Sequence, residues 1–267
     1  MQRITFSLGL ILVFGLLSCT ASAQSGNSQA GSNSKSAAFK KISFESSDGV
    51  AITADLYKPH QDAKTPFIVL CHQAGWSRGE YREIAPKLNA MGFNCLAIDQ
   101  RSGGKINGVN NETMRQAKAA SKPVQYVDAQ QDMVAAIDYA KKNYAQGKLI
   151  LWGSSYSSAL AIRIAGEHPD KIDGALAFAP GEYFKSQGKS GSWIQQSAKK
   201  IKDPVFITSA KNEFKNWRSI SEAIPPELIH TFLPKTNGNH GSRALWKQFD
   251  DNESYWTAVK AFLEQVK

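Results

Sequence analysis

Short, uninterrupted apolar runs recur along this chain and alternate with stretches of helical period. A run that is apolar at every position is typical of a strand buried on both faces, as in a parallel sheet covered by helices. Apolar residues at helical spacing occur between the runs, at 126–144, and again in the last helix, at 256–266. The pattern predicts an α/β domain with a mostly parallel central sheet and helices on both faces. The strand candidates are 67–71, 95–98, 149–152, 174–178, 205–208 and 229–233.

The sheet is expected to begin with an antiparallel pair. Residues 41–45 and 50–57 alternate between apolar and polar side chains, and the sequence Ser-Ser-Asp-Gly lies between them. Alternating runs on either side of such a turn predict a β-hairpin. With this hairpin, residues 39–267 suit a single domain that can bury a full core, and no internal repeat is visible.

The first 23 residues have the features of a bacterial export signal. Arg3 supplies a positive charge, and the apolar run over 4–17 is short for a membrane span. Two cleavage sites compete. The motif Leu-Leu-Ser-Cys ending at Cys19 resembles a lipobox, in which cleavage before Cys19 and lipidation make it the new N-terminus, whereas Ala-Ser-Ala ending at Ala23 resembles an ordinary signal-peptidase site. We favour the lipobox.

Residues 24–38 are rich in Ser, Gly, Asn and Gln and have no apolar period, which predicts a flexible tether. The two segments together predict export from a bacterial cytoplasm. The product would be either a lipoprotein attached to a membrane through Cys19 or a periplasmic or secreted protein.

Charge and cysteine content exclude two classes of function. The formal net charge is +9, but the lysines are scattered and form no basic helix with interleaved aromatics, so we expect a solvated surface and no nucleic-acid partner. Cys71 and Cys95 both fall in strand candidates, where buried thiols are expected more than a disulfide. Their spacing matches no metal motif, so no metal is expected.

A candidate nucleophile follows the apolar run at 149–152. Gly-Ser-Ser-Tyr-Ser at 153–157 is a G-x-S-x-S variant of the nucleophile elbow, and a helix is expected directly after it. The central serine of an elbow is held in a strained turn, and the residues two before and two after it face each other closely and must be small. Ser155 has that position, with Gly153 and Ser157 on either side. The alternative is a small-residue helix start that packs on the sheet.

A base and an orienting carboxylate follow in the chain. His240 lies in a polar, glycine-rich loop after the last strand candidate, and Glu213 lies in the loop after the strand at 205–208. Loops after parallel strands meet at one edge of the sheet, so Ser155, Glu213 and His240 are expected to come together as a triad in the chain order of α/β-hydrolases. The alternatives are a mobile loop histidine and a solvated glutamate.

Five motifs in order, taken together, resemble the α/β-hydrolase superfamily over the whole of 39–267, particularly its dienelactone-hydrolase-like and esterase-type members. They are Leu-Cys-His-Gln-Ala-Gly at 70–75, Asp-Gln-Arg-Ser-Gly-Gly at 99–104, the elbow, the segment 204–213 and Asn-His-Gly at 239–241.

The resemblance implies the α/β-hydrolase fold with a short lid, at 179–203, and an oxyanion hole made by the N–H groups of Ala74 and Tyr156. Gln73 stands where the family has glycine. Serine stands where dienelactone hydrolases have cysteine, which favours an ester substrate. The chemistry needs no cofactor.

The sequence thus predicts an exported serine hydrolase, a carboxylesterase acting on a small-molecule acyl substrate. A serine peptidase or an acyltransferase on the same fold is the first alternative, and a non-catalytic envelope binding protein is the second. Nothing in the sequence indicates an oligomeric state. Four aromatic residues are candidates either to line an apolar acyl pocket or to serve packing: Trp76, Tyr81, Tyr156 and Trp193.

Overall fold

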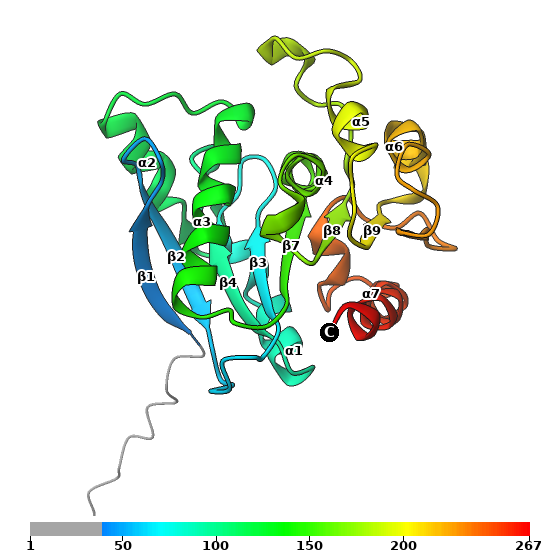
Figure 1. The fold of residues 1–267 in the computed structure, drawn as a ribbon, viewed down its shortest axis with the longest axis horizontal. Helices are drawn as coiled ribbons and strands as arrows, with labels where there is room; N and C mark the ends of the chain where they lie inside the picture. Colours follow the sequence, from blue (N-terminus) through cyan, green and yellow to red (C-terminus); the bar gives the residue numbers. More distant parts are fainter. Residues whose placement is uncertain (1–38) are drawn as a thin grey trace, which may run out of the picture. The chain divides into compact units, whose positions relative to one another are not determined.

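A computed structural model describes residues 39–267. The predictions of export, lipidation at Cys19 and a tether at 24–38 concern residues that lie outside the described ones. The described chain forms an eight-stranded sheet in the order β1-β2-β4-β3-β7-β8-β9-β10 (Figure 1). Its strands are β1 (Lys40–Glu45), β2 (Ala51–Tyr57), β3 (Phe67–Cys71), β4 (Asn94–Ile98), β7 (Leu149–Ser154), β8 (Gly174–Phe178), β9 (Val205–Thr208) and β10 (Ile229–Phe232). Two short strands, β5 (Lys105–Ile106) and β6 (Val109–Asn110), form a separate antiparallel hairpin.

The sheet is antiparallel at its first edge and parallel elsewhere. Strand β1 pairs antiparallel with β2, and β2 pairs antiparallel with β4. All other neighbours are parallel. The turn between β1 and β2 ends at Gly49, whose φ of 82° is unfavourable for a residue with a side chain. The predicted fold class is therefore confirmed, including the N-terminal hairpin.

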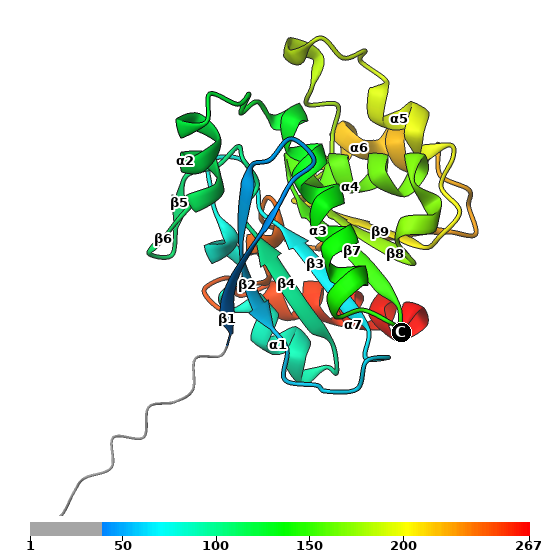
Figure 2. The ribbon, with the colours of Figure 1, turned by 60° about the vertical axis from the view of Figure 1, so that its left-hand side comes forward.

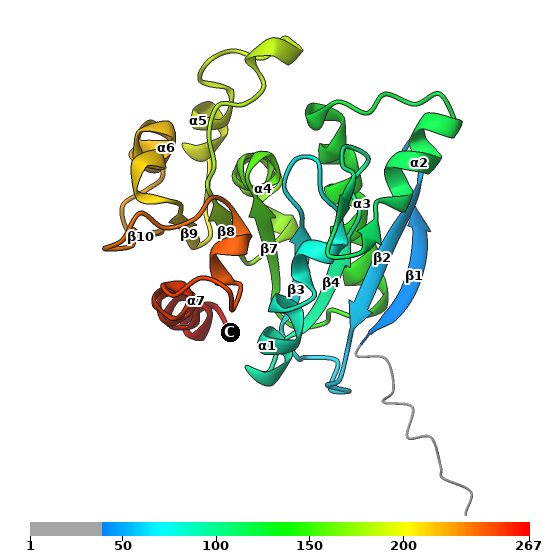
Figure 3. The same cartoon turned by 180° about the vertical axis from the view of Figure 1, so that it is seen from behind.

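Helices cover both faces of the sheet. Alternate residues of β3 explain this, because Phe67, Val69 and Cys71 face the cluster that contains α3 and α4, whereas Ile68 and Leu70 face the cluster that contains α1 and α7. Figures 2 and 3 show the two sets of helices on opposite sides of the strands. The α-helices are α1 (Ile84–Ala90), α2 (Glu112–Ala119), α3 (Ala129–Asn143), α4 (Tyr156–Glu167), α5 (Trp193–Ala198), α6 (Phe214–Ser221) and α7 (Asn252–Val266). Within 39–267, none is both long and apolar enough to cross a membrane.

The two cysteines of the domain are free thiols. Cys71 on β3 and Cys95 on β4 are close in the sheet, since Cys95 pairs with Ile68, but their side chains lie in the clusters of opposite faces. Burial raises the pKa of both thiols. They therefore act as small core residues, as the sequence predicts.

Candidate active site

The turn between β7 and α4 has the geometry of a nucleophile elbow. Ser155 connects the two elements with φ 57° and ψ −122°, a backbone conformation that is strained for a residue with a Cβ. Gly153 allows the close turn, because a Cβ there would lie 2.3 Å from the carbonyl oxygen of Ser157. The strand therefore presents the Ser155 hydroxyl at the carboxyl edge of the sheet.

Ser157 replaces the second glycine of the usual elbow and takes a structural part in this one. Its side chain is fully buried. Its hydroxyl oxygen accepts the N–H of Ser154 at 2.8 Å, and the hydroxyl lies within hydrogen-bond distance of the carbonyl of Cys71, at 2.8 Å. The extra side chain thus joins the start of α4 to β7 and β3.

The structure brings the three predicted triad residues together. Ser155 Oγ lies 2.8 Å from His240 Nε2, and His240 Nδ1 lies 2.5 Å from Glu213 Oε1. The second carboxylate oxygen of Glu213 accepts the N–H of Ala210 at 3.1 Å, which fixes the carboxylate in its own loop. A carboxylate that orients an imidazole, itself bonded to a hydroxyl, is the arrangement that activates serine as a nucleophile.

Two loops hold the histidine and the glutamate in place. Glu213 ends the 3₁₀ turn Lys211–Glu213 after β9, and the loop of His240 follows β10. The N–H of Lys211 donates to the carbonyl of Asn237 at 2.9 Å, so the two loops are bonded to each other. Tyr255 of α7 contacts both loops, because its hydroxyl donates to the carbonyl of Ser209 at 3.0 Å and accepts the N–H of Asn239 at 3.4 Å. Backbone contacts rather than the side chains alone therefore set the distance between acid and base.

His72 shapes the loop after β3 and is not a second base. Burial lowers its pKa to about 4, so the imidazole is neutral near pH 7. Its contacts then assign the tautomer: Nδ1–H donates to the carbonyl of Gln73 at 2.8 Å, and Nε2 accepts the N–H of Gln100 at 3.0 Å. Position 73 does not require a glycine, because the residue of this loop with a positive φ, 73°, is Gly75.

The N–H groups proposed for the oxyanion hole have no acceptor among the described residues. Neither Ala74 N–H nor Tyr156 N–H makes a hydrogen bond within 39–267 outside the regular helices and strands. Tyr156 opens α4, and the first N–H groups of a helix have no partner within it. Both groups are thus available to a substrate oxygen.

Two of the four aromatic residues considered for the acyl pocket serve packing. Tyr81 is fully buried and donates its hydroxyl to the carbonyl of Cys71 at 2.6 Å, and Trp193 packs against Arg163 and Phe184. For these two residues the structure favours the packing alternative, because Tyr81 has no exposed surface and the ring of Trp193 is covered in part by Arg163 and Phe184.

A hollow of about 350 Å³ borders the loop after β3 at Gly75. The ring of Tyr126, on the wall of the hollow, is tilted by 31° against the ring of Tyr156, with the ring centroids 4.7 Å apart. A larger groove, of about 780 Å³, runs along α3. Neither lining includes a triad residue, but the smaller hollow borders Gly75, the residue after Ala74, so we associate the chemistry with the smaller hollow. The smaller hollow is lined by Gly75, Ser102, Gly103, Met114, Val124, Gln125, Tyr126 and Gln187.

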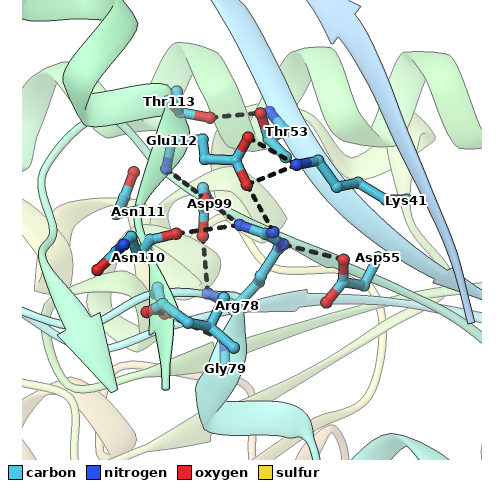
Figure 4. Close-up of polar contacts among 12 residues, drawn as sticks. Lys41, Thr53, Asp55, Arg78, Gly79, Asp99, Asn110, Asn111, Glu112 and Thr113 are labelled. Carbon is cyan, nitrogen blue, oxygen red and sulfur yellow. Dashed lines mark hydrogen bonds and ion pairs between the residues drawn. The ribbon is translucent and has the colours of Figure 1, made fainter. Parts of the chain in front are cut away.

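A buried ion network in the connection after β3 was not predicted from the sequence. Arg78, in the 3₁₀ turn η1 (Arg78–Tyr81), bonds to Asp55 at 2.9 Å, to Asp99 at 2.6 Å and to Glu112 at 2.9 Å (Figure 4). The three carboxylates come from β2, from the residue after β4 and from α2, and all three contact the guanidinium of Arg78. Residues 39–267 contain no group of three or more His, Cys, Asp or Glu side chains arranged to hold a metal ion.

Comparison with known protein families agrees with this fold. Residues 62–223, more than half of the chain, match the model of the family described as serine aminopeptidase, S33. The chain belongs to this family. It is thereby a member of the α/β-hydrolase superfamily and a hydrolase by family. The matched span contains Ser155 and Glu213 and ends before His240.

Individual relatives are more distant. The thiohydrolase apmlB of Arthrinium phaeospermum is 29% identical over 179 residues, which are 63% of this chain and 54% of that protein, so the chain spans about half the length of this curated relative. The esterase Pf2001 of Pyrococcus furiosus has a TM-score of 0.63 at 19% identity, over 85% of this chain and 92% of that one. The dienelactone hydrolase of Anabaena variabilis has a TM-score of 0.62 at 15% identity, over 85% and 98%. At these identities the two structures share the fold with this chain.

Proposed function

We propose that this chain is a serine hydrolase that cleaves small carboxylic esters through an acyl-enzyme on Ser155. The observation that carries the proposal is the continuous set of contacts from Ser155 Oγ through His240 to Glu213. Family membership supports hydrolysis as the reaction class.

The geometry supports a two-step acyl transfer. Ser155 Oγ attacks the carbonyl carbon and passes its proton to His240 Nε2, and the oxyanion forms against the N–H groups of Ala74 and Tyr156. As the carbon–oxygen bond to the leaving group breaks, the imidazolium returns that proton to the departing alcohol. Water, deprotonated by the same imidazole, then attacks the acyl carbon. As the bond from that carbon to Ser155 Oγ breaks, the imidazolium returns the proton to Ser155 Oγ and the acid is released. Glu213 stabilises the imidazolium in both steps.

The surroundings of the site favour a small substrate. The hollow beside Gly75, of about 350 Å³, matches a short acyl or alcohol group, and the segment between β8 and β9 carries only the short helix α5 and one 3₁₀ turn. The relative from Arthrinium phaeospermum is named a thiohydrolase. A thioester would be cleaved by the same steps, so both oxygen esters and thioesters belong in the substrate screen.

The test is reaction of the purified protein with a fluorophosphonate probe, followed by mapping of the modified residue. Such a probe requires an activated serine next to oxyanion donors. We expect modification at Ser155, none in Ser155→Ala or His240→Ala, and normal modification in the control variant His168→Ala. Hydrolysis of 4-nitrophenyl acetate should be lost in the same two variants.

The rival functions give different results in the same experiments. Faster turnover of aminoacyl 4-nitroanilides than of esters would favour the peptidase, and acyl transfer to an added alcohol in preference to water would favour the acyltransferase. Folded protein that neither reacts with the probe nor turns over any ester would contradict the proposal and favour a non-catalytic binding protein.

We also propose that the chain is exported and anchored through a lipid on Cys19. The charged start, the apolar run and the lipobox support this proposal. Incorporation of an alkyne fatty acid in growing bacteria, lost in Cys19→Ala, would be the expected result. Release of unlabelled protein cut after Ala23 would contradict anchoring and leave export intact.

A further inference from the structure

A buried carboxyl group lies beneath the elbow. Glu80, in the η1 turn, is fully buried. Its Oε1 accepts the hydroxyl of Ser154 at 2.7 Å, and its Oε2 accepts the backbone N–H of Gln73 at 2.8 Å. Ser154 immediately precedes Ser155, and Gln73 immediately precedes Ala74. One side chain thus bonds to the neighbours of both the nucleophile and an oxyanion donor.

The same network reaches the loop of the histidine. Ser154 Oγ accepts the N–H of Ser242, two residues after His240, at 2.8 Å. Space at this point is tight, because a Cβ on Gly241 would lie 2.6 Å from Ser154 Oγ and 2.8 Å from Gln73 Oε1. The carboxyl of Glu80 therefore connects three loops that carry the proposed chemistry.

Further contacts fix the backbone of the turn that carries Glu80. Two residues before it, Arg78 is bonded to three carboxylates (Figure 4). One residue after it, Tyr81 donates its hydroxyl to the carbonyl of Cys71 at 2.6 Å. The indole N–H of Trp246 donates to the carbonyl of Glu80 itself at 3.0 Å. The carboxyl consequently has a fixed position against which the loops can be aligned.

We propose that Glu80 is a positioning residue for the reaction, acting through Ser154 and Gln73 to hold Ser155, Ala74 and the loop of His240 in reactive alignment. This inference rests on the proposed function. Glu80 does not touch the substrate; it accepts from two donors at once, which requires two acceptor oxygens on one planar group.

The substitution Glu80→Gln tests this role with almost no change in shape. A glutamine amide has one acceptor oxygen, so it cannot accept from both Ser154 and Gln73. Misalignment of reacting groups by a fraction of an ångström is expected to lower kcat by about tenfold to a hundredfold, with KM changed less than about twofold. Glu83→Gln is the matched control, because Glu83 is exposed and, within 39–267, its carboxylate accepts only the N–H of Lys247, at 3.1 Å. It should retain the kcat of the wild type.

A double-mutant cycle tests whether the effect passes through Ser154. Ser154→Ala should also lower kcat with little change in KM. The change in log kcat of the double variant should be clearly smaller than the sum of the changes in the two single variants. If Glu80→Gln fails to fold, Ser154→Ala alone decides, since an unchanged kcat in that variant contradicts the inference. Unchanged kcat in Glu80→Gln, or additive effects, would equally overturn it.

A second readout separates this inference from the proposed function. The ¹⁵N chemical shifts of the His240 imidazole, measured in protein labelled on histidine, report its contacts with Ser155 and Glu213 whether or not the protein hydrolyses esters. We expect them to change in Glu80→Gln and to remain those of the wild type in Glu83→Gln. A wild-type protein without esterase activity refutes the proposed function, whereas unchanged shifts in Glu80→Gln refute the role of Glu80.

Discussion

A methyl group added at Gly153 tests the steric account of the elbow. In Gly153→Ala the new Cβ would lie 2.3 Å from the carbonyl oxygen of Ser157 and 2.5 Å from the Cα of Ser158, although real Cβ contacts essentially never fall below 3.0 Å. Both obstructing atoms belong to the backbone of α4, so no side-chain rotation can relieve the clash. The first turn of α4 has to move away from β7 by roughly 0.7 Å or more, which is the difference between the 2.3 Å approach and the 3.0 Å limit.

The movement has two measurable consequences. Forcing an extra methyl group into a packed site costs about 1–3 kcal/mol, which for a domain of this size corresponds to a decrease in Tm of roughly 2–12 °C. The same movement displaces Ser155, which lies between β7 and α4, and a displacement approaching 1 Å costs about a hundredfold in rate. Thermal unfolding and hydrolysis of 4-nitrophenyl acetate measure the two effects on the same sample.

Gly191→Ala is the matched control. A Cβ at Gly191 meets nothing within 4 Å, and the residue lies in the exposed segment between β8 and α5. We expect unchanged activity and a stability equal to that of the wild type or up to about 1 kcal/mol higher, because alanine restricts the unfolded chain. Gly153→Ala with the Tm of Gly191→Ala and a kcat within about threefold of the wild type would refute the steric reasoning.

Three further outcomes follow from the same geometry. Ser155→Gly should be more stable than Ser155→Ala by about 1 kcal/mol in urea unfolding, since only glycine adopts φ 57° and ψ −122° without strain; equal stability would contradict strain at the elbow. Glu213→Gln should lower kcat by about a thousandfold, because an amide N–H₂ facing Nδ1 favours the wrong tautomer of His240; a loss below about tenfold in a pH–rate series would show that Glu213 does not orient the base. Burial raises the pKa of Glu80 from 4.5 to about 7, against the opposing effect of its hydrogen bonds with Ser154 and Gln73. Between these two pH values the native carboxyl therefore keeps a proton that the unfolded chain releases. The free energy of unfolding of the wild type should therefore fall with rising pH, by about 3 kcal/mol relative to Glu80→Gln, and parallel pH curves for the two proteins would contradict the shift.

The sequence predicts the strands of this domain well for a physical reason. A strand with helices on both faces has to be apolar throughout, so β3, β8 and β9 begin and end where the apolar runs do. β10 is half-buried along most of its length and ends one residue before the run does, at Phe232. The elbow can also be predicted from the sequence, because its small residues meet a local steric requirement that holds for any chain with this turn.

Other elements leave no readable pattern. Helix α1 has 7 residues, too few for a helical period to stand out. Helix α2 is largely polar. It is attached to strand β2 of the N-terminal hairpin by a hydrogen bond from Thr53 N–H to Thr113 Oγ1 rather than by an apolar face. The stretch 102–123 that contains α2 therefore shows only its polarity in the sequence.

The burial of Glu80 could not be predicted from the sequence for a different reason. It stands among polar residues in Ser-Arg-Gly-Glu-Tyr, where an exposed carboxylate is the default expectation. Its burial depends on contacts with Gln73 and Ser154, and the second of these is far away in the sequence. These residues come together only in the folded chain. The two donors, one to each carboxylate oxygen, then show that Glu80 uses both oxygens as acceptors.

The distribution of buried polar side chains explains why the site is accurate. An apolar contact is non-directional and lets packed elements slide by small amounts, whereas a buried hydrogen bond fixes both a distance and an angle and is costly to break. Most interior positions of β3, β7, β8 and β9 are accordingly apolar. Polar burial concentrates at or just after the carboxyl ends of β3, β4, β7 and β9 and in the loop after β10. The residues concerned include His72, Gln73, Arg78, Glu80, Asp99, Gln100, Arg101, Ser154, Ser157, Ser158, Ser209 and Ser242. The chain thus uses directional bonds where loops must be held to a fraction of an ångström, and apolar packing where burial alone is enough. Removal of a single hydrogen bond beneath the elbow should therefore lower kcat strongly and the free energy of unfolding only slightly. Truncation of a core residue such as Leu151 should lower the free energy of unfolding strongly and kcat only slightly.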